Sequence, residues 1–231
     1  MSDYAAPANA VLFDVDGTLV DSNYLHIHAW QRAFAEADIP VAAWRIHRCI
    51  GMDGTELVKA LSGEAPEDVL GQLKDLHSRF YQDTAELLKP LPGALDLIKR
   101  VEDLGLQVVL ATSAPEDELA LLRRVLDSEE VYSAVTSSED VSTAKPEPDI
   151  VNTALERAGV DVDRAVFVGD AVWDVEACVR AELDCIGVLS GGVSRGELET
   201  AGAVAVFEDA ADLLAHLDTT RIGTLDRLAR Q

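Results

Sequence analysis

Short apolar runs alternate with helical stretches over most of the chain, and this alternation constrains the fold more than any other feature. The strand-like runs are Ala10–Phe13, Leu106–Ala111, Ala134–Thr136, Ala165–Val168, Cys185–Val188 and Ala203–Phe207. The helical stretches are Ala94–Leu104, Glu116–Leu126, Asp149–Ala158, Val175–Ala181 and Ala210–Leu217. A helix between two strands supplies the crossover that parallel pairing needs. The pattern therefore predicts an α/β protein with a doubly wound parallel sheet and helices on both faces.

From Tyr24 to Leu88 the pattern changes, and few strand-like runs interrupt this stretch. Apolar residues recur at helical spacing in two stripes: Leu25, Ala29, Trp30, Ala33 and Phe34, then Val69, Leu73, Leu76 and Phe80. Proline and glycine near residues 39–40, 51–54 and 63–66 divide this stretch. We therefore expect a core built from residues 1–21 and 89–231, with residues 22–88 inserted as a helical domain. Residues 22–88 are called the helical insertion below.

The composition is that of a globular protein. Apolar residues make up 48% of the 231 residues, and the mean hydropathy is +0.07. The sequence lacks the run of roughly 20 apolar residues that crosses a bilayer, and the first ten residues show no secretory signal. The three cysteines, Cys49, Cys178 and Cys185, have no regular spacing. We therefore expect no disulfide framework and a cytoplasmic, reducing location.

The chain carries a large excess of negative charge. Its 42 acidic and 19 basic side chains give a formal charge of −23. Such a surface repels nucleic acid and anionic membranes, so neither is expected as a partner. An anionic substrate needs a local positive centre in this protein. The sequence leaves open whether the chain is a monomer or a homodimer.

One stretch, VLFDVDGTLVDS at residues 11–22, ends a buried strand on Asp14 and Asp16, with Gly17 behind them. Two later strands end at Thr112 and Asp170, and a segment carrying Lys145 lies between them. Ligands of open parallel sheets bind beyond the carboxyl ends of the strands. We therefore expect these side chains to converge on one crevice.

Carboxylates gathered in one crevice repel each other unless a cation neutralises them, and oxygen ligands suit Mg²⁺. With Mg²⁺ and a lysine offsetting its charge, a phosphate group can enter such a site. Asp14 at the strand end can attack phosphorus and form an aspartyl-phosphate. Asp16 can move protons in the same pocket, because a sharp turn at Gly17 swings it back.

At this point the sequence resembles a known family. Four segments are similar to the four motifs of the haloacid dehalogenase-like hydrolase superfamily: DVDGTLV at 14–20, VLATS at 109–113, KPEPD at 145–149 and VGDAVWD at 168–174. Their order and spacing match over nearly the whole chain. The helical insertion resembles the mobile cap of the phosphoglycolate phosphatase and β-phosphoglucomutase branch. The resemblance implies a Rossmann-like catalytic core with an inserted α-helical cap domain.

The resemblance also implies roles for single residues. Asp14 is the expected nucleophile, and Asp16 the general acid/base whose backbone carbonyl helps to hold Mg²⁺. Thr112 and Ser113 are expected to bind the phosphoryl group or substrate, and Lys145 to position the nucleophile and offset phosphate charge. The implied metal residues are Asp14, Asp16, Asp170 and Asp174. Asp174 also has a structural alternative, as a partner of a helix N-terminus.

Substrate contacts are expected from the helical insertion. The stretch around His26 and Trp30 resembles the β-phosphoglucomutase segment in which a histidine and a tryptophan face the substrate. Residues 51–54 resemble the specificity loop, so Gly51 and Asp53 are expected near the substrate. The mutase arginine of that loop falls on Gly54, and the later mutase lysine falls near Asp83. Arg45 or Arg48 can compensate, and His28 and His77 are interpreted as surface or packing residues.

Because two mutase cations are missing, the sequence favours a Mg²⁺-dependent phosphatase acting on a small phosphorylated metabolite over a β-phosphoglucomutase-like mutase. Asp16 argues against a 2-haloacid dehalogenase, since such enzymes lack the second aspartate. A non-catalytic binding module is disfavoured because every charged catalytic position is filled. A P-loop ATPase is excluded because GxxxxGK[ST] does not occur in the sequence.

Overall fold

The computed structural model describes residues 9–63 and 66–229. Within them lies a parallel sheet of six strands in the order β3-β2-β1-β4-β5-β6. The strands are β1 (Ala10–Phe13), β2 (Gln107–Ala111), β3 (Tyr132–Thr136), β4 (Ala165–Gly169), β5 (Cys185–Val188) and β6 (Ala205–Phe207). The strand order reverses at β1, which pairs with both β2 and β4. This is the expected doubly wound α/β fold, and the reversal marks where such sheets bind ligands.

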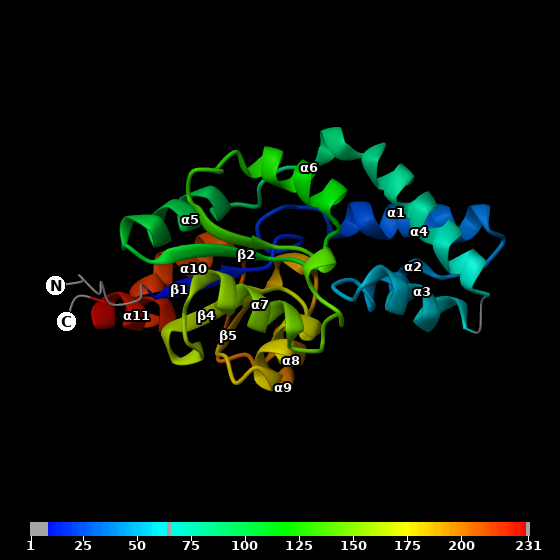
Figure 1. Cartoon of the computed structure of the whole chain (residues 1–231). Helices are drawn as coiled ribbons and strands as arrows, with labels where there is room; N and C mark the ends of the chain where they lie inside the picture. Colours follow the sequence, from blue (N-terminus) through cyan, green and yellow to red (C-terminus); the bar gives the residue numbers. More distant parts are fainter. Residues whose placement is uncertain (1–8, 64–65, 230–231) are drawn as a thin grey trace.

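Side chains of β1 alternate between two apolar layers, as the period of a strand requires. Val11 and Phe13 belong to one buried cluster, and Ala10 and Leu12 to the other. The core helices that contribute to the first cluster are α5 (Ala94–Asp103), α6 (Glu116–Leu126), α10 (Ala210–His216) and α11 (Arg221–Ala229), and the cluster continues into the helical insertion. Three contribute to the second: α7 (Asp149–Ala158), α8 (Val172–Arg180) and α9 (Arg195–Ala201). The sheet is therefore covered on both faces (Figure 1).

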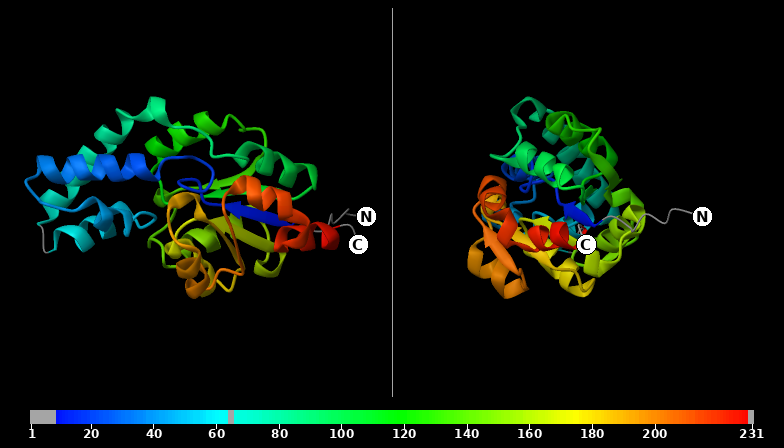
Figure 2. Two further views of the ribbon diagram at one scale, coloured as in Figure 1. Left: turned by 180° about the vertical axis from the view of Figure 1, so that it is seen from behind. Right: turned by 90° about the vertical axis from the view of Figure 1, so that its left-hand side faces the viewer.

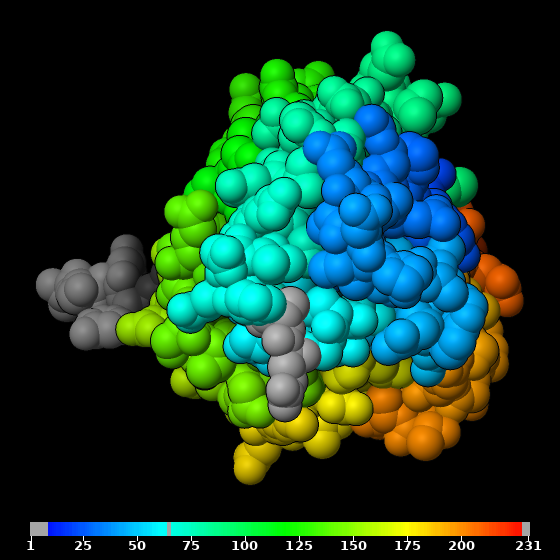
Figure 3. All heavy atoms as spheres, turned by 90° about the vertical axis from the view of Figure 1, so that its right-hand side faces the viewer, coloured from blue at the N-terminus to red at the C-terminus, as the bar shows by residue number. Residues whose placement is uncertain are grey.

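The helical insertion contains α1 (Asn23–Glu36), α2 (Ala43–His47), α3 (Gly54–Ser62) and α4 (Glu67–Gln82). Helices α1 and α4 run side by side and bury Trp30, Phe34, Leu73 and Phe80 between them and their neighbours. The insertion lies beyond the carboxyl ends of the strands (Figures 1 and 2). Viewed from that side, its atoms cover the end of the sheet (Figure 3). The domain boundaries at residues 22 and 88 remain a prediction.

Some elements differ from the sequence expectation. Helix α8 begins at Val172 rather than Val175, and β6 begins at Ala205 rather than Ala203. Helices α9 and α11 were not predicted. Short 3₁₀ turns connect other elements: η1 (Ala85–Leu87), η2 (Ser138–Asp140), η3 (Val162–Arg164), η4 (Leu189–Gly191) and η5 (Leu217–Thr219). Among the described residues, the helices are too short or too polar to cross a membrane.

Candidate active site

The expected core residues do come together at the reversal point of the sheet. Asp14 follows β1, Thr112 follows β2 and Asp170 follows β4, so their side chains enter from adjacent strands. The loop before α7 brings Lys145 beneath them. Its Nζ lies 2.7 Å from Asp14 Oδ1 and 2.6 Å from Asp174 Oδ1. All of these side chains are buried, and a single ammonium group therefore holds two carboxylates in place.

Asp14, Asp170 and Asp174 form a cluster in which one oxygen from each lies within 4.8 Å of the others. Burial raises the pKa of Asp14 well above its usual range, although Lys145 opposes the rise. Burial and the charge of Asp174 raise the pKa of Asp170 to about 7. Attraction to Asp14 and Asp174 outweighs burial and raises the pKa of Lys145. Two of the three carboxylates contact Lys145, and the charge of the lysine offsets only one of the three.

The donor set of this cluster fits a hard divalent cation. Its atoms are carboxylate oxygens, the ligands that Mg²⁺ prefers, and the charge balance leaves room for two positive charges. Asp170 is held from two sides: Thr18 Oγ1 donates to its Oδ1 and Asn23 Nδ2 to its Oδ2, each at 2.9 Å. The sequence reasoning had missed both supporting residues.

Asp174 also serves the structural alternative considered from the sequence. Its Oδ2 accepts a hydrogen bond from the backbone N–H of Ala171 at 3.0 Å, at the start of α8. Its other oxygen faces Lys145. The side chain therefore fixes the first turn of the helix and still belongs to the carboxylate cluster.

Asp16 sits on the turn after β1 and has different partners from Asp14. Ser22 Oγ donates to Asp16 Oδ1 at 2.5 Å, and His26 Nε2 lies 3.1 Å from the same oxygen. Burial would raise the pKa of Asp16, but His26 and these hydrogen bonds outweigh burial and lower it. Gly17 makes the turn possible: its φ is +72°, and a Cβ there would lie 2.6 Å from Asp170 Oδ2.

His26, His77 and Glu118 form a second buried polar cluster. His26 Nδ1 lies 3.1 Å from His77 Nε2, and His77 Nδ1 lies 3.4 Å from Glu118 Oε1. The two imidazole rings have centroids 5.2 Å apart and planes within 14° of each other, so the facing nitrogens point at one another. A distance of 3.1 Å between facing nitrogens is that of a hydrogen bond. A metal ion on the line between them would need about 4 Å, twice the usual metal–nitrogen distance.

The packing role expected for His77 is present, because its ring stacks on Trp30 at 4.1 Å. The same residue also joins the polar cluster, which periodicity alone could not indicate. Burial and the proximity of His26 lower the pKa of His77 well below its usual range. Burial also opposes protonation of His26, but Asp16 outweighs it and raises the pKa of His26. Burial raises the pKa of Glu118 to about 7.

A cavity of about 320 Å³ lies between the strand ends and the helical insertion. Its size is at the lower end of the range of small-molecule sites. The predicted site residues that line it are Asp14, Asp16, His26, Gly51, Asp53, Thr112, Ser113, Asp170 and Asp174. Lys145 does not line this cavity but lies behind Asp14, at the edge of a neighbouring hollow. Asp53 also caps α3, accepting from Thr55 N at 2.7 Å.

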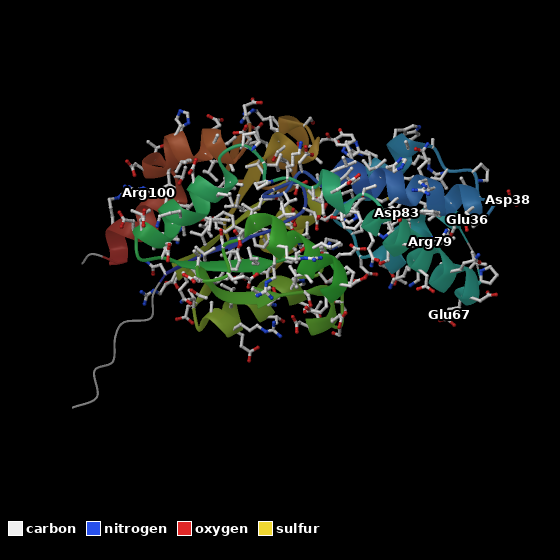
Figure 4. The ribbon with its side chains drawn as sticks, turned by 90° about the horizontal axis from the view of Figure 1, so that it is seen from above. Glu36, Asp38, Glu67, Arg79, Asp83 and Arg100 are labelled. Atoms are coloured by element: carbon white, nitrogen blue, oxygen red, sulfur yellow. The ribbon has the colours of Figure 1, made fainter. Side chains whose placement is uncertain are left out.

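The two arginines that the sequence offered as substitutes for the missing mutase cations do not line the cavity. Asp83 is exposed and pairs with Arg32 at 3.7 Å, on the surface of α1 and α4 that also carries Arg79 (Figure 4). Arg48 pairs with Glu197 at 2.5 Å, and neither Arg45 nor Arg48 lines the cavity. Lys74 does line it, with its Cε 3.8 Å from the position of a Cβ on Gly54.

Comparison with known proteins gives one family. Residues 11–188 match the haloacid dehalogenase-like hydrolase family. A phosphorylated carbohydrates phosphatase of Thermotoga maritima is 30% identical over 86% of this chain and 94% of its own length. A phosphoglycolate phosphatase of Escherichia coli K12 is 30% identical over 90% of this chain and 91% of its own. The crystal structure of a hydrolase from Pseudomonas syringae is 37% identical, with a TM-score of 0.87 over 91% of this chain and 98% of its own.

The chain therefore belongs to the haloacid dehalogenase-like hydrolase family. The family expected from the four motifs is confirmed, and the relatives agree with the expected enzyme class, a phosphoric monoester hydrolase.

Proposed function

We propose that this haloacid dehalogenase-like hydrolase is a Mg²⁺-dependent phosphatase that cleaves a small phosphorylated metabolite through an aspartyl-phosphate on Asp14. The observation that carries the proposal is that two carboxyl groups with different basic partners line one cavity. Asp14 contacts Lys145, and Asp16 contacts His26. The names of the relatives support a substrate of the sugar phosphate or phosphoglycolate type. The small volume of the cavity agrees with this size class.

In the first step, a carboxylate oxygen of Asp14 attacks phosphorus, and the bond from phosphorus to the ester oxygen breaks. The ester oxygen takes the electron pair, receives a proton from Asp16 and leaves as the hydroxyl group of an alcohol. Lys145 holds Asp14 in one orientation for this attack. Thr112 and Ser113 lie at the end of the adjacent strand, where their hydroxyl groups can bind the phosphoryl oxygens.

In the second step, water attacks the phosphorus of the aspartyl-phosphate while Asp16 takes up a proton from that water. The bond from phosphorus to the Asp14 oxygen breaks, phosphate leaves and the carboxylate is restored. Asp14, Asp170 and Asp174, with the backbone carbonyl of Asp16, are the groups that would hold Mg²⁺. When bound, the ion supplies positive charge to offset that of the phosphate. The helical insertion acts as the cap that excludes bulk water from the cavity.

The test is phosphate release from a panel of sugar phosphates, phosphoglycolate and nucleotides with Mg²⁺ present. Asp14→Asn should reduce turnover below detection, because the amide is not a nucleophile, while the circular dichroism spectrum stays unchanged. EDTA should inactivate the wild-type enzyme and added Mg²⁺ should restore it. An Asp14→Asn variant with substantial activity would contradict the assignment of the nucleophile.

Lys74 is the specific observation that keeps a sugar-phosphate mutase as the second candidate. Its Cε lies 3.8 Å from the position of a Cβ on Gly54, where the mutase arginine falls, and its ammonium group donates to Thr55 Oγ1 at 3.1 Å. From the wall of the cavity this ammonium group can contact a second phosphate. Against this, the acidic residues Asp53, Asp75 and Asp117 also line the cavity. With glucose 1-phosphate, phosphate release faster than formation of glucose 6-phosphate supports the phosphatase. The opposite order supports the mutase.

A further inference from the structure

The described residues contain a continuous buried path of polar contacts that the proposed reaction leaves unexplained. It runs from Asp16 through His26 and His77 to Glu118, with contacts of 3.1, 3.1 and 3.4 Å. Asp16 and Glu118 belong to the sheet region, and the two histidines belong to α1 and α4 of the helical insertion. Glu118 lies on α6, after the β2 strand end that also carries Thr112. The path thus leaves the core, crosses the insertion and returns to the core.

We propose that His77 and Glu118 are positioning residues for the general acid/base: through His26 they fix the carboxyl group of Asp16 in the cavity. The inference rests on the proposed function, because it concerns the role of Asp16 in protonating the leaving group. Neither residue was a predicted site residue, and neither contacts the Asp14, Asp170 and Asp174 cluster.

Packing leaves His26 and His77 little freedom to turn. His26 stacks on Tyr81 at 4.0 Å with 12° between the ring planes, and His77 stacks on Trp30 at 4.1 Å with 17°. Glu118 is 3% exposed and His77 is 6% exposed. Buried polar groups are costly without partners, so each member of the path depends on the next one for its hydrogen bonds.

The hydrogen-bond directions are consistent from end to end. With Glu118 protonated and both histidines neutral, Glu118 donates its O–H to His77 Nδ1, His77 donates Nε2–H to His26 Nδ1, and His26 donates Nε2–H to Asp16. With His26 protonated and Glu118 ionised, His26 donates from both nitrogens, and His77 donates Nδ1–H to Glu118. Burial favours the first pattern, because it raises the pKa of Glu118 to about 7 and lowers that of His77. Asp16 favours the second, because it raises the pKa of His26. Each contact has one donor and one acceptor in both patterns. Loss of Glu118 leaves the Nδ1 of His77 without a partner, so the tautomers of the two stacked rings are no longer fixed.

The consequence is measurable through the leaving group. A general acid matters most for a poor leaving group and little for a good one. Substituted phenyl phosphates differ in leaving-group acidity but hardly in shape. The value of kcat/KM reports the first irreversible step, the transfer of the phosphoryl group to Asp14. A displaced Asp16 therefore makes kcat/KM depend more steeply on leaving-group acidity. A general loss of structure or of binding lowers kcat/KM for all of these substrates alike. The dependence of kcat/KM on leaving-group acidity is called the slope below.

The decisive variants are Glu118→Leu, Glu118→Gln and His77→Phe. Leucine removes the contact to His77, whereas glutamine has both a donor and an acceptor and preserves it. Phenylalanine at 77 keeps the stack on Trp30 but lacks both nitrogens. For Glu118→Leu and His77→Phe, kcat/KM should fall at least about tenfold with phenyl phosphate. With p-nitrophenyl phosphate it should fall by no more than about threefold. Glu118→Gln should stay close to wild type with both substrates.

Two controls separate the possible failures. Glu116→Leu makes the same chemical change in the first turn of the same helix, where Glu116 accepts from Ser137 Oγ, and it should not alter the slope. Asp16→Asn should steepen the slope more than any of the path variants. If Asp16→Asn does not, the role of Asp16 in the proposed function is wrong.

If Asp16→Asn steepens the slope and Glu118→Leu and His77→Phe do not, only the inference about the path is wrong. A Glu118→Gln variant as impaired as Glu118→Leu also overturns it, because the carboxyl group itself is then required. Should Glu118→Leu fail to fold, His77→Phe decides the question alone.

Discussion

Asp170 lies so close to Gly191 that a side chain of even one methyl group at position 191 would overlap its carboxylate. A Cβ added to Gly191 would lie 1.7 Å from Asp170 Oδ2. The backbone carbonyl of Gly191 also accepts from Asn23 Nδ2 at 3.3 Å, the same amide that donates to Asp170. Glycine at this position therefore allows η4 to approach the carboxylate cluster and to fix the rotamer of Asp170.

Gly191→Ala should accordingly displace Asp170 and weaken Mg²⁺ binding. The Mg²⁺ concentration for half-maximal activity should rise by about 10- to 100-fold, the usual effect of disturbing the groups around a metal ligand. Gly196→Ala is the matched control, because an added Cβ there has no atom within 4 Å. An unchanged Mg²⁺ dependence in Gly191→Ala would show that Asp170 does not hold the ion.

The raised pKa of Glu118 makes a prediction about stability. Burial raises it from 4.5 to about 7 in the folded protein, with Asp16 and Asp117 adding to the rise and His26 opposing it. Between these two pKa values the unfolded chain releases the Glu118 proton more readily than the folded protein does. Rising pH therefore favours unfolding over this range. Wild type should lose up to about 3 kcal/mol relative to Glu118→Gln between pH 5 and 8. Urea unfolding of both proteins measures this, and a pH-independent difference would mean that Glu118 is ionised in the fold.

Single residues also show where the sequence was informative and where it was not. Asp14, Thr112 and Asp170 could be placed together because each follows a strand, and parallel strands present their carboxyl ends at one edge. His77 and Glu118 meet only because α4 of the insertion packs over α6, and such a contact between distant helices leaves no local pattern. The position of Lys74 in the cavity wall could not be predicted either, because side-chain direction on α4 depends on its rotation against α1.

At the scale of elements, the apolar stripes of the insertion predict which residues stabilise it. Phe34 on α1 is 1% exposed and lies against Trp30, with ring centroids 6.0 Å apart. Phe34→Ala should lower the free energy of unfolding by about 3–5 kcal/mol. Leu87→Ala, at a side chain that is 56% exposed, should change it by no more than about 0.5 kcal/mol. Equal effects in urea unfolding would contradict the packing of α1.

The helices that the sequence did not predict have physical reasons of their own. Helix α9 buries only Leu198 among its residues and follows a glycine-rich loop, so it lacks an apolar stripe. It begins instead with a Ser194–Glu197 capping pair, a local signal that was overlooked. In α11, Ile222 and Leu225 are both fully buried, and their spacing of three residues is helical. Strands were more predictable because continuous apolar runs mark burial on both faces.

For the whole molecule, the excess of acidic side chains decides whether attraction within ion pairs or repulsion among like charges has the larger effect on stability. The chain has 42 acidic and 19 basic side chains, so most acids have no lysine or arginine to pair with. Several of the available cations are already engaged, such as Arg79 with Glu36 on the surface shown in Figure 4. Exposed pairs of this kind contribute little stability. Repulsion among the remaining acids should therefore dominate the effect of salt on stability.

Raising NaCl from about 0.01 to about 0.15 M shortens the screening length from about 30 to about 8 Å. Because repulsion destabilises the compact state, the free energy of unfolding at pH 7 should rise by on the order of 1 kcal/mol. Urea unfolding in EDTA measures this without divalent ions. Choline chloride at equal ionic strength is the control, and a matching rise identifies screening rather than Na⁺ binding at the carboxylate cluster. A fall in stability with both salts would mean that the surface ion pairs outweigh the repulsion.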